Sequence, residues 1–206
     1  MSGRRLICIP ALACIALTSS PIIRGADSAL IVQARGLIGE QSYDKAVPIL
    51  EEALSENKND ATAAELLGMA DLYSTGNLDS RRNAEKAESA FVQALELGGS
   101  ASLLMSLAKD KVKGPNVLTA EPGVLTIFRD RVEFVPTRNP SEDRLSIGSE
   151  ALKECGHSRS YGKSSNTLYL KTSKGEFFFR PHHFSAEEGT LVCKLVAKYF
   201  GAKSIP

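Results

Sequence analysis

The sequence predicts an α+β protein: a helical half, then a small antiparallel β domain closed by a final helix. Two changes of pattern lead to this prediction. Apolar residues recur at helical spacing from Ser28 to about Lys113, and beyond that point they alternate with polar residues in short stretches. From Ser185 to Phe200 the apolar residues return to helical spacing. The chain has 206 residues, enough for two domains.

The charge balance argues against a nucleic-acid partner. The chain carries 25 Lys and Arg residues against 24 Asp and Glu residues, and its net charge is therefore +1. Sequence-independent binding to nucleic acid needs a basic excess on one face. Aromatic residues make up 6% of the chain and Trp is absent, which weakens the case for bases stacking on aromatic side chains.

The first residues have the three-part layout of a secretory signal peptide. Two arginines, at positions 4 and 5, precede an apolar run from Leu6 to Leu17. Small residues at Ala26 and Ser28 then satisfy the requirement for cleavage just before residue 29. The run is shorter than the roughly 20 apolar residues that span a bilayer. The sequence thus predicts a signal peptide at residues 1–28 and a secreted or periplasmic protein.

Two alternatives stay open at this end of the chain. The segment could be retained as an uncleaved anchor. Ala11 to Cys14 also resembles a bacterial lipobox, in which Cys14 is acylated after cleavage. Ala11 stands where that pattern prefers Leu, however, and the apolar run continues past Cys14 to Leu17. One acyl chain at Cys14 would anchor the protein only weakly.

The cysteines divide into two pairs. Cys8 and Cys14 lie in the signal segment and leave with it, whereas Cys155 and Cys193 remain in the mature chain. Export places the second pair in an oxidising compartment, where a disulfide between them is allowed. The alternative is two separate thiols, because two cysteines do not by themselves define a disulfide framework.

The helical half contains an internal repeat. Small residues at i and i+7, with a large apolar residue at i+4, let one helix pack closely against another. The first stretch, Tyr43, Ala46, Leu50, Ala53 and Leu54, corresponds to Ala84, Ala87, Phe91, Ala94 and Leu95 in the second.

This repeat resembles the tetratricopeptide repeat, a helix–turn–helix unit of about 34 residues. Leu67 and Gly68 stand where that family has its Leu-Gly pair. Lys58 replaces the usual proline between repeats, and Asp71 replaces an aromatic residue. About seven extra residues, from Asn77 to Asn83, are similar to the insertion of the related Sel1-like repeats. A generic bundle of α-hairpins is the alternative.

The resemblance implies that the first helix of each repeat lines a concave, peptide-binding face. Few repeats leave apolar surface open on that side, and such surface usually marks an interface. We therefore expect a protein partner in this groove, unless the C-terminal domain of the same chain fills it. The corresponding positions are Ile31, Arg35, Ile38, Glu65, Met69 and Leu72.

The end of the helical half is expected near residue 112. Gly98 and Gly99 stop the fourth helix, and Ala101 to Lys111 is typical of a fifth helix that caps the repeats. The stretch at residues 113–123, KGPNVLTAEPG, has no periodicity and contains Pro, Gly and Asn, which is typical of a linker. The repeats then cover residues 29–112.

Alternating apolar residues predict a series of short strands after the linker. Gly175 supplies the turn of the last hairpin. Ser185 and Glu188 form a capping box at the start of the final helix, and Gly201 ends that helix. The expected strands are Leu125 to Ile127, Val132 to Phe134, Arg144 to Ile147, Leu152 to Gly156, Thr167 to Thr172 and Glu176 to Arg180.

The strands and the closing helix resemble the pleckstrin-homology and GRAM-like fold, in which a C-terminal helix plugs a curved sheet. The matching segments are GVLTIFRDRVEF, LYLKTSKGEFFFRP and the final helix. The resemblance implies a β domain over residues 124–201. An unrelated α+β sandwich is the alternative.

No residue pattern predicts catalysis, a bound metal or a cofactor. The three histidines, His157, His182 and His183, are not accompanied by cysteine or carboxylate ligands at metal-binding spacing. Cys155 precedes His157 by two residues, but no third residue is identifiable that would orient the histidine as a base. A glycine-rich phosphate loop is also absent from the sequence. We therefore expect that the chain is not an enzyme.

One group of basic residues suggests a second kind of partner. Some domains of the pleckstrin-homology superfold bind phosphorylated lipid head groups through cations in their loops. A solvated surface is the alternative explanation for such cations. The basic residues concerned are Lys153, Arg159, Lys163, Lys171 and Lys174.

These features together favour an exported, non-enzymatic scaffold for protein–protein interaction. A membrane-surface adaptor that binds anionic lipid through the basic loops is the second hypothesis. A hydrolase without a recognisable motif is the third.

We predict that the mature chain begins between Asp27 and Ala29, because the small residues Ala26 and Ser28 follow a short apolar run. N-terminal sequencing of the secreted form checks this prediction. Recovery of Cys14 as the first residue, with the added mass of an acyl chain, would contradict it and support the lipobox.

Overall fold

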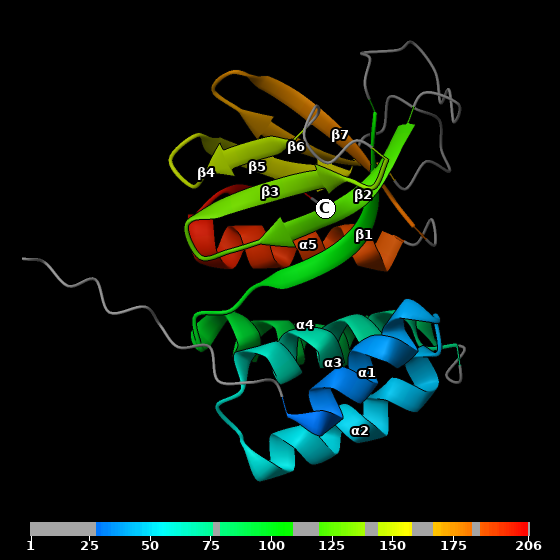
Figure 1. Ribbon diagram of the computed structural model, residues 1–206. Helices are drawn as coiled ribbons and strands as arrows, with labels where there is room; N and C mark the ends of the chain where they lie inside the picture. Colours follow the sequence, from blue (N-terminus) through cyan, green and yellow to red (C-terminus); the bar gives the residue numbers. More distant parts are fainter. Residues whose placement is uncertain are drawn as a thin grey trace, which may run out of the picture.

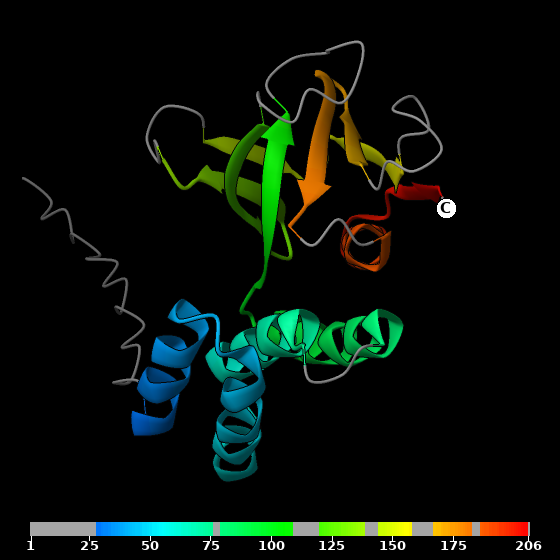
Figure 2. The same cartoon turned by 90° about the vertical axis from the view of Figure 1, so that its right-hand side faces the viewer.

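The computed structural model describes residues 28–75, 79–108, 120–138, 144–157, 167–182 and 186–205. The first four helices of the described residues pack together on one side of the curved sheet that the strands form (Figure 1). The last helix lies between the sheet and these helices (Figure 2). This arrangement confirms the predicted α+β class. The expected signal segment and the lipobox at Cys14 lie outside the described residues.

Three of the first four helices begin at a residue whose side chain caps them. The Asp60 carboxylate accepts hydrogen bonds from the backbone N–H groups of Thr62 and Ala63, at 2.9 and 3.0 Å. Asp79 accepts one from the N–H of Arg82 at 3.2 Å. These bonds satisfy N–H groups that have no partner inside a helix. The four helices are α1 (Ala29–Gly39), α2 (Tyr43–Glu56), α3 (Ala61–Tyr73) and α4 (Ser80–Glu96).

Helix α3 is buried along most of its length because it packs on both sides. Ala63 and Ala70 belong to a core formed with α1 and α2, whereas Leu72 and Tyr73 belong to a core shared with the sheet. Gly68 lies against Phe91 of α4, and a Cβ at that position would lie 2.6 Å from the Phe91 ring. Small residues therefore allow α1, α2, α4 and the sheet to approach the same helix.

The described strands form one sheet in the order β4-β3-β2-β1-β7-β6-β5-β8. All neighbouring strands are antiparallel except β5 and β8, which are parallel. Helix α5 (Ala186–Phe200) follows β7 and closes the β domain. The strands are β1 (Ala101–Ala108), β2 (Ala120–Ile127), β3 (Arg131–Pro136), β4 (Leu145–Gly148), β5 (Leu152–His157), β6 (Leu168–Thr172), β7 (Gly175–Pro181) and β8 (Lys203–Ile205).

The predicted capping helix from Ala101 to Lys111 is wrong, because residues 101–108 form strand β1. Ala101, Leu103 and Met105 are buried, and the residues between them are only half-buried, which is the period of a strand. The strand pairs with β2 on one side and β7 on the other. The helical half therefore ends at α4. Residues 113–119 of the expected linker lie outside the described residues. The last four residues of that linker, 120–123, belong to β2.

The other expected strands and the final helix are present near their predicted bounds. Ser185 of the expected capping box lies outside the described residues. The antiparallel strands closed by α5 are compatible with the pleckstrin-homology-like architecture that the sequence suggests. The two helix pairs are also present, but their membership of the tetratricopeptide family stays a prediction.

The two halves of the chain share one hydrophobic core. Phe91 and Leu95 of α4 belong to the same buried cluster as Leu125 and Phe134 of the sheet. A disulfide between Cys155 of β5 and Cys193 of α5 joins the sheet to the closing helix, with the Cα atoms 5.3 Å apart. The pairing that the sequence left open is therefore present in the structure.

We predict that Gly68→Ala lowers the free energy of unfolding by about 1–3 kcal/mol, because the added methyl group overpacks the contact with Phe91. Gly36→Ala is the matched control. Gly36 is also helical, but a Cβ there meets no atom within 4 Å, and we expect it to stabilise the protein by about 0.5–1 kcal/mol. Urea unfolding monitored by circular dichroism measures both effects. Equal effects of the two substitutions would contradict the packing assigned to Gly68.

Candidate functional site

The six residues expected to line a peptide groove do not line one open cleft. Ile31 and Ile38 pack in the core of α1, α2 and α3. Leu72 and Met69 pack in the core shared with the sheet. Leu72 and Met69 are covered because the sheet packs against α3, whereas Ile31 and Ile38 pack against α2 and α3. The chain's own β domain therefore occupies the α3 part of the expected groove.

The two charged members of that set have different surroundings. The Glu65 carboxylate accepts a hydrogen bond from the Ser102 hydroxyl of β1 at 2.5 Å. The same hydroxyl lies 3.2 Å from the Thr126 hydroxyl of β2. Arg35 is exposed on α1. Glu65 therefore orients the sheet on α3 and is engaged within the chain.

The basic residues of the β domain are interleaved with carboxylates. Lys171 of β6 lies directly opposite Glu154 of β5 and Glu176 of β7. Glu154 in turn lies opposite Lys203 of β8. Charges of alternating sign thus cross four strands on one face, an arrangement that opposite-charge pairs stabilise. This row does not form a single-sign surface for an anionic membrane.

Two further lysines of the expected basic set are exposed, Lys153 in β5 and Lys174 in a turn. The Lys153 ammonium donates a hydrogen bond to the Glu150 carbonyl at 3.0 Å. Lys174 lies in the turn between β6 and β7. Arg159 and Lys163 lie outside the described residues. Within the described part of the chain, no helix has an apolar stretch long enough to cross a membrane.

The histidines and cysteines do not form a reactive centre among the described residues. No group of three or more His, Cys, Asp or Glu residues there could hold a metal ion. Cys155 is bonded to Cys193, and so its sulfur is not a free thiol. The side chains of His157 and His183 are outside the described residues. His182 instead contacts the Tyr73 ring edge-on, with the ring centroids 6.4 Å apart.

Tyr73 joins the helical layer to the sheet. Its ring is buried beside Tyr43, 5.5 Å between centroids. Its phenol oxygen accepts a hydrogen bond from the Leu104 N–H of β1 at 2.7 Å. Burial, reinforced by the nearby Glu188 carboxylate of α5, raises the pKa of the Tyr73 phenol well above its usual value. The phenol therefore stays neutral at physiological pH.

A cleft of about 340 Å³ opens where α4 lies beside α5. It is built from both halves of the chain, and so neither half contains it alone. Three carboxylates and two cations line it, together with small or apolar side chains of which Ala84 and Leu191 are buried. Its lining comprises Arg81, Ala84, Glu85 and Glu88 of α4 with Ala186, Glu187, Thr190, Leu191 and Lys194 of α5.

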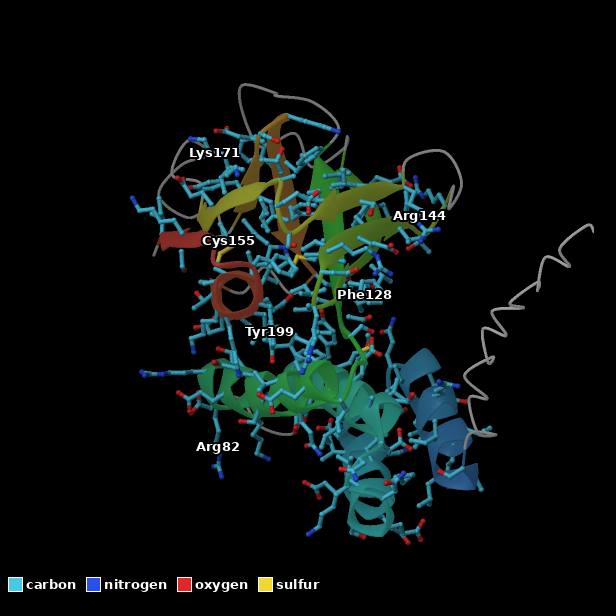
Figure 3. All side chains as sticks on the ribbon, turned by 90° about the vertical axis from the view of Figure 1, so that its left-hand side faces the viewer. Arg82, Phe128, Arg144, Cys155, Lys171 and Tyr199 are labelled. Atoms are coloured by element: carbon cyan, nitrogen blue, oxygen red, sulfur yellow. A yellow bond between two sulfur atoms is a disulfide. The ribbon has the colours of Figure 1, made fainter. Side chains whose placement is uncertain are left out.

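Two ion pairs hold the walls of this cleft together. The Lys194 ammonium contacts the Glu88 carboxylate at 2.6 Å, across the cleft. Further along the same two helices, Lys198 contacts Glu96 at 3.4 Å. The Tyr199 hydroxyl also donates to the Val92 carbonyl at 3.4 Å, and Figure 3 shows Tyr199 between α5 and α4. Exposed ion pairs of this kind contribute only about 0–1 kcal/mol each to stability. A charged group of a ligand can therefore replace one partner of such a pair at little cost in free energy.

The sequence alone did not point to this cleft. Its two walls are separated by about ninety residues or more, and each wall contains ordinary solvent-facing side chains. One signal was present in retrospect. Two glutamates of α4 and two lysines of α5 each recur at helical spacing, so that a row of negative charge on one helix can pair with a row of positive charge on the other. These residues are Glu88, Glu96, Lys194 and Lys198.

Comparisons with known proteins give only distant similarities of fold. No family model and no curated protein matches the chain. Among solved structures, the N-terminal PH domain of human ARAP2 has a TM-score of 0.39 at 12% identity, over 50% of this chain and 80% of that one. The C-terminal domain of an unknown protein from Leishmania infantum has a TM-score of 0.35 at 16% identity, over 46% and 81%. Inhibited Vav1 has a TM-score of 0.30 at 8% identity, over 82% and 61%. None of these similarities indicates what this chain binds.

We predict that Tyr73→Phe lowers the free energy of unfolding by about 1–3 kcal/mol, because the Leu104 N–H at the junction loses its acceptor. Tyr43→Phe is the control, since it removes a hydroxyl from the neighbouring ring without touching that bond. We expect its effect to stay below about 0.5 kcal/mol. Urea unfolding measures both variants, and equal stability of Tyr73→Phe and the wild type would contradict the bridging role of Tyr73.

Proposed function

We propose that this chain is an exported, non-enzymatic scaffold that binds a protein partner in the cleft between α4 and α5. The single observation that carries the proposal is the cleft itself, with its charged rim and its floor of Ala84 and Leu191. A polar rim around an apolar centre is the usual anatomy of a protein interface. The cleft volume of about 340 Å³ is at the lower end of the range for ligand pockets, which suits one or two inserted side chains.

Export is supported by two independent features. The N-terminal segment has the layout of a signal peptide. The Cys155–Cys193 disulfide is the kind of bond that persists in oxidising compartments. We therefore propose a secreted or periplasmic location, in which the disulfide holds α5 in position as one wall of the cleft.

The lipid-binding alternative has less support from the described residues. Lys171 is flanked by Glu154 and Glu176, and so its charge is offset at short range. Binding to an anionic surface depends on a local excess of cations, each contributing about 1 kcal/mol near the surface. The charge row on β8, β5, β6 and β7 gives no such excess.

The test is a pull-down from an envelope extract with the mature chain and two variants. Thr190→Trp places an indole in the cleft from an exposed position on α5. Gln33→Trp is the control, because Gln33 is an exposed helical residue of α1 and does not line the cleft. We expect the wild type and Gln33→Trp to capture a specific partner equally, and Thr190→Trp to capture at least about tenfold less of it, a loss of about 1.4 kcal/mol in binding free energy.

Two results would contradict this proposal. Equal capture by all three proteins would show that the cleft is not the binding site. Salt-sensitive binding to vesicles of phosphatidylglycerol and phosphatidylcholine, unchanged by Thr190→Trp and without a captured protein, would support the membrane adaptor instead.

A further inference from the structure

A three-residue strand, β8, covers the edge of the sheet next to β5. Lys203, Ser204 and Ile205 lie opposite Glu154, Cys155 and Gly156 in a parallel register. On its other side β5 pairs with β6 from Leu152 to His157, and so β8 covers only the middle of the strand. A sheet edge offers unpaired N–H and C=O groups to any extended chain that can reach it.

Strand β8 itself is weakly held. Lys203 and Ser204 are exposed, and Ile205 is only half-buried. Ala202 is buried and anchors the segment, whereas Gly201 has a left-handed backbone (φ 63°) where α5 ends. Parallel pairing is slightly less stable per residue than antiparallel pairing, and three residues give few backbone bonds. Short edge segments with little buried apolar surface open at a low free-energy cost.

The β5 edge, in contrast, is shaped to receive a strand. A Cβ at Gly156 would lie 2.9 Å from the Ile205 carbonyl oxygen and 3.0 Å from the Tyr169 ring. The missing side chain therefore allows a neighbouring backbone to approach closely. The Tyr169 hydroxyl donates a hydrogen bond to Glu154, which fixes that carboxylate beside the position of Lys203.

The edge also stays in place without β8. The disulfide from Cys155 to Cys193 ties β5 to α5. Leu170 of β6, opposite Cys155, is fully buried. Departure of β8 would therefore leave a preorganised edge and not a disordered one, which lowers the cost of binding a replacement strand.

We propose that the β5 edge is a strand-addition site for an extended segment of a protein partner, and that β8 is the resident strand the partner displaces. The segment presents a basic residue beside Glu154 and an apolar residue two positions later, as Lys203 and Ile205 do. Main-chain hydrogen bonds hold such a strand, and the alternate side chains give the selectivity. This site is separate from the α4–α5 cleft and does not depend on it.

The experiment uses the full mature chain and a capped synthetic peptide with the sequence of residues 201–206. Ile205→Ser weakens the resident strand, and Val32→Ser is the control, because Val32 is an exposed β-branched residue on α1 (60% exposed). Fluorescence anisotropy measures binding of the labelled peptide. We expect Ile205→Ser to bind it at least about tenfold more tightly than the wild type or Val32→Ser, since a larger fraction of its edges is open.

A second peptide, with glutamate in place of lysine, tests the chemistry of the site. We expect it to bind Ile205→Ser at least about tenfold more weakly, because it places a carboxylate beside Glu154. Adding Glu154→Gln to Ile205→Ser should remove most of this discrimination. Equal binding of the two peptides to Ile205→Ser, or equal affinity of Ile205→Ser and Val32→Ser, would overturn the proposal. Loss of peptide binding on adding Thr190→Trp would also overturn it, by placing the peptide in the cleft.

Discussion

The whole structure depends on the packing of α3 against neighbours on both sides. One side of this helix completes the core of α1 and α2, and the other completes the core beneath the sheet. Such packing requires small residues, and α3 supplies Ala63, Ala64, Gly68 and Ala70. At Gly68 the Phe91 ring occupies the space of the missing side chain.

This constraint determines where a partner can bind. The concave side of the helix pairs would be open in a free-standing repeat array. Here the β domain covers it, through Tyr73 on Leu104 and Glu65 on Ser102. Under the proposed function, the partner binds instead where the two halves meet, in the cleft between α4 and α5. The disulfide and the shared core hold that cleft in one shape, which favours recognition without large rearrangement.

Local signals in the sequence predicted most of the fold. Gly98 and Gly99 mark the end of α4, Gly175 marks the turn of the last hairpin, and period-two alternation marks most strands. Strand β1 was mispredicted because ASLLMSLA is rich in Leu and Ala, and so it fits both helical and strand spacing. Strand β8 is too short to give any pattern. The cleft could not be predicted because its walls meet only after the β domain docks on α3 and α4.

The shared core makes α3, α4 and the β domain one cooperative unit. Native-state hydrogen exchange, measured residue by residue in increasing urea, tests this cooperativity. We predict that the amides of Leu72 and Phe91 in the helices and of Leu125 and Phe134 in the sheet share one opening free energy and one urea dependence. Helices α1 and α2 should open at lower free energy, since their core is separate. Global opening of residues 61–96 at a urea concentration where the strands remain protected would contradict the claim.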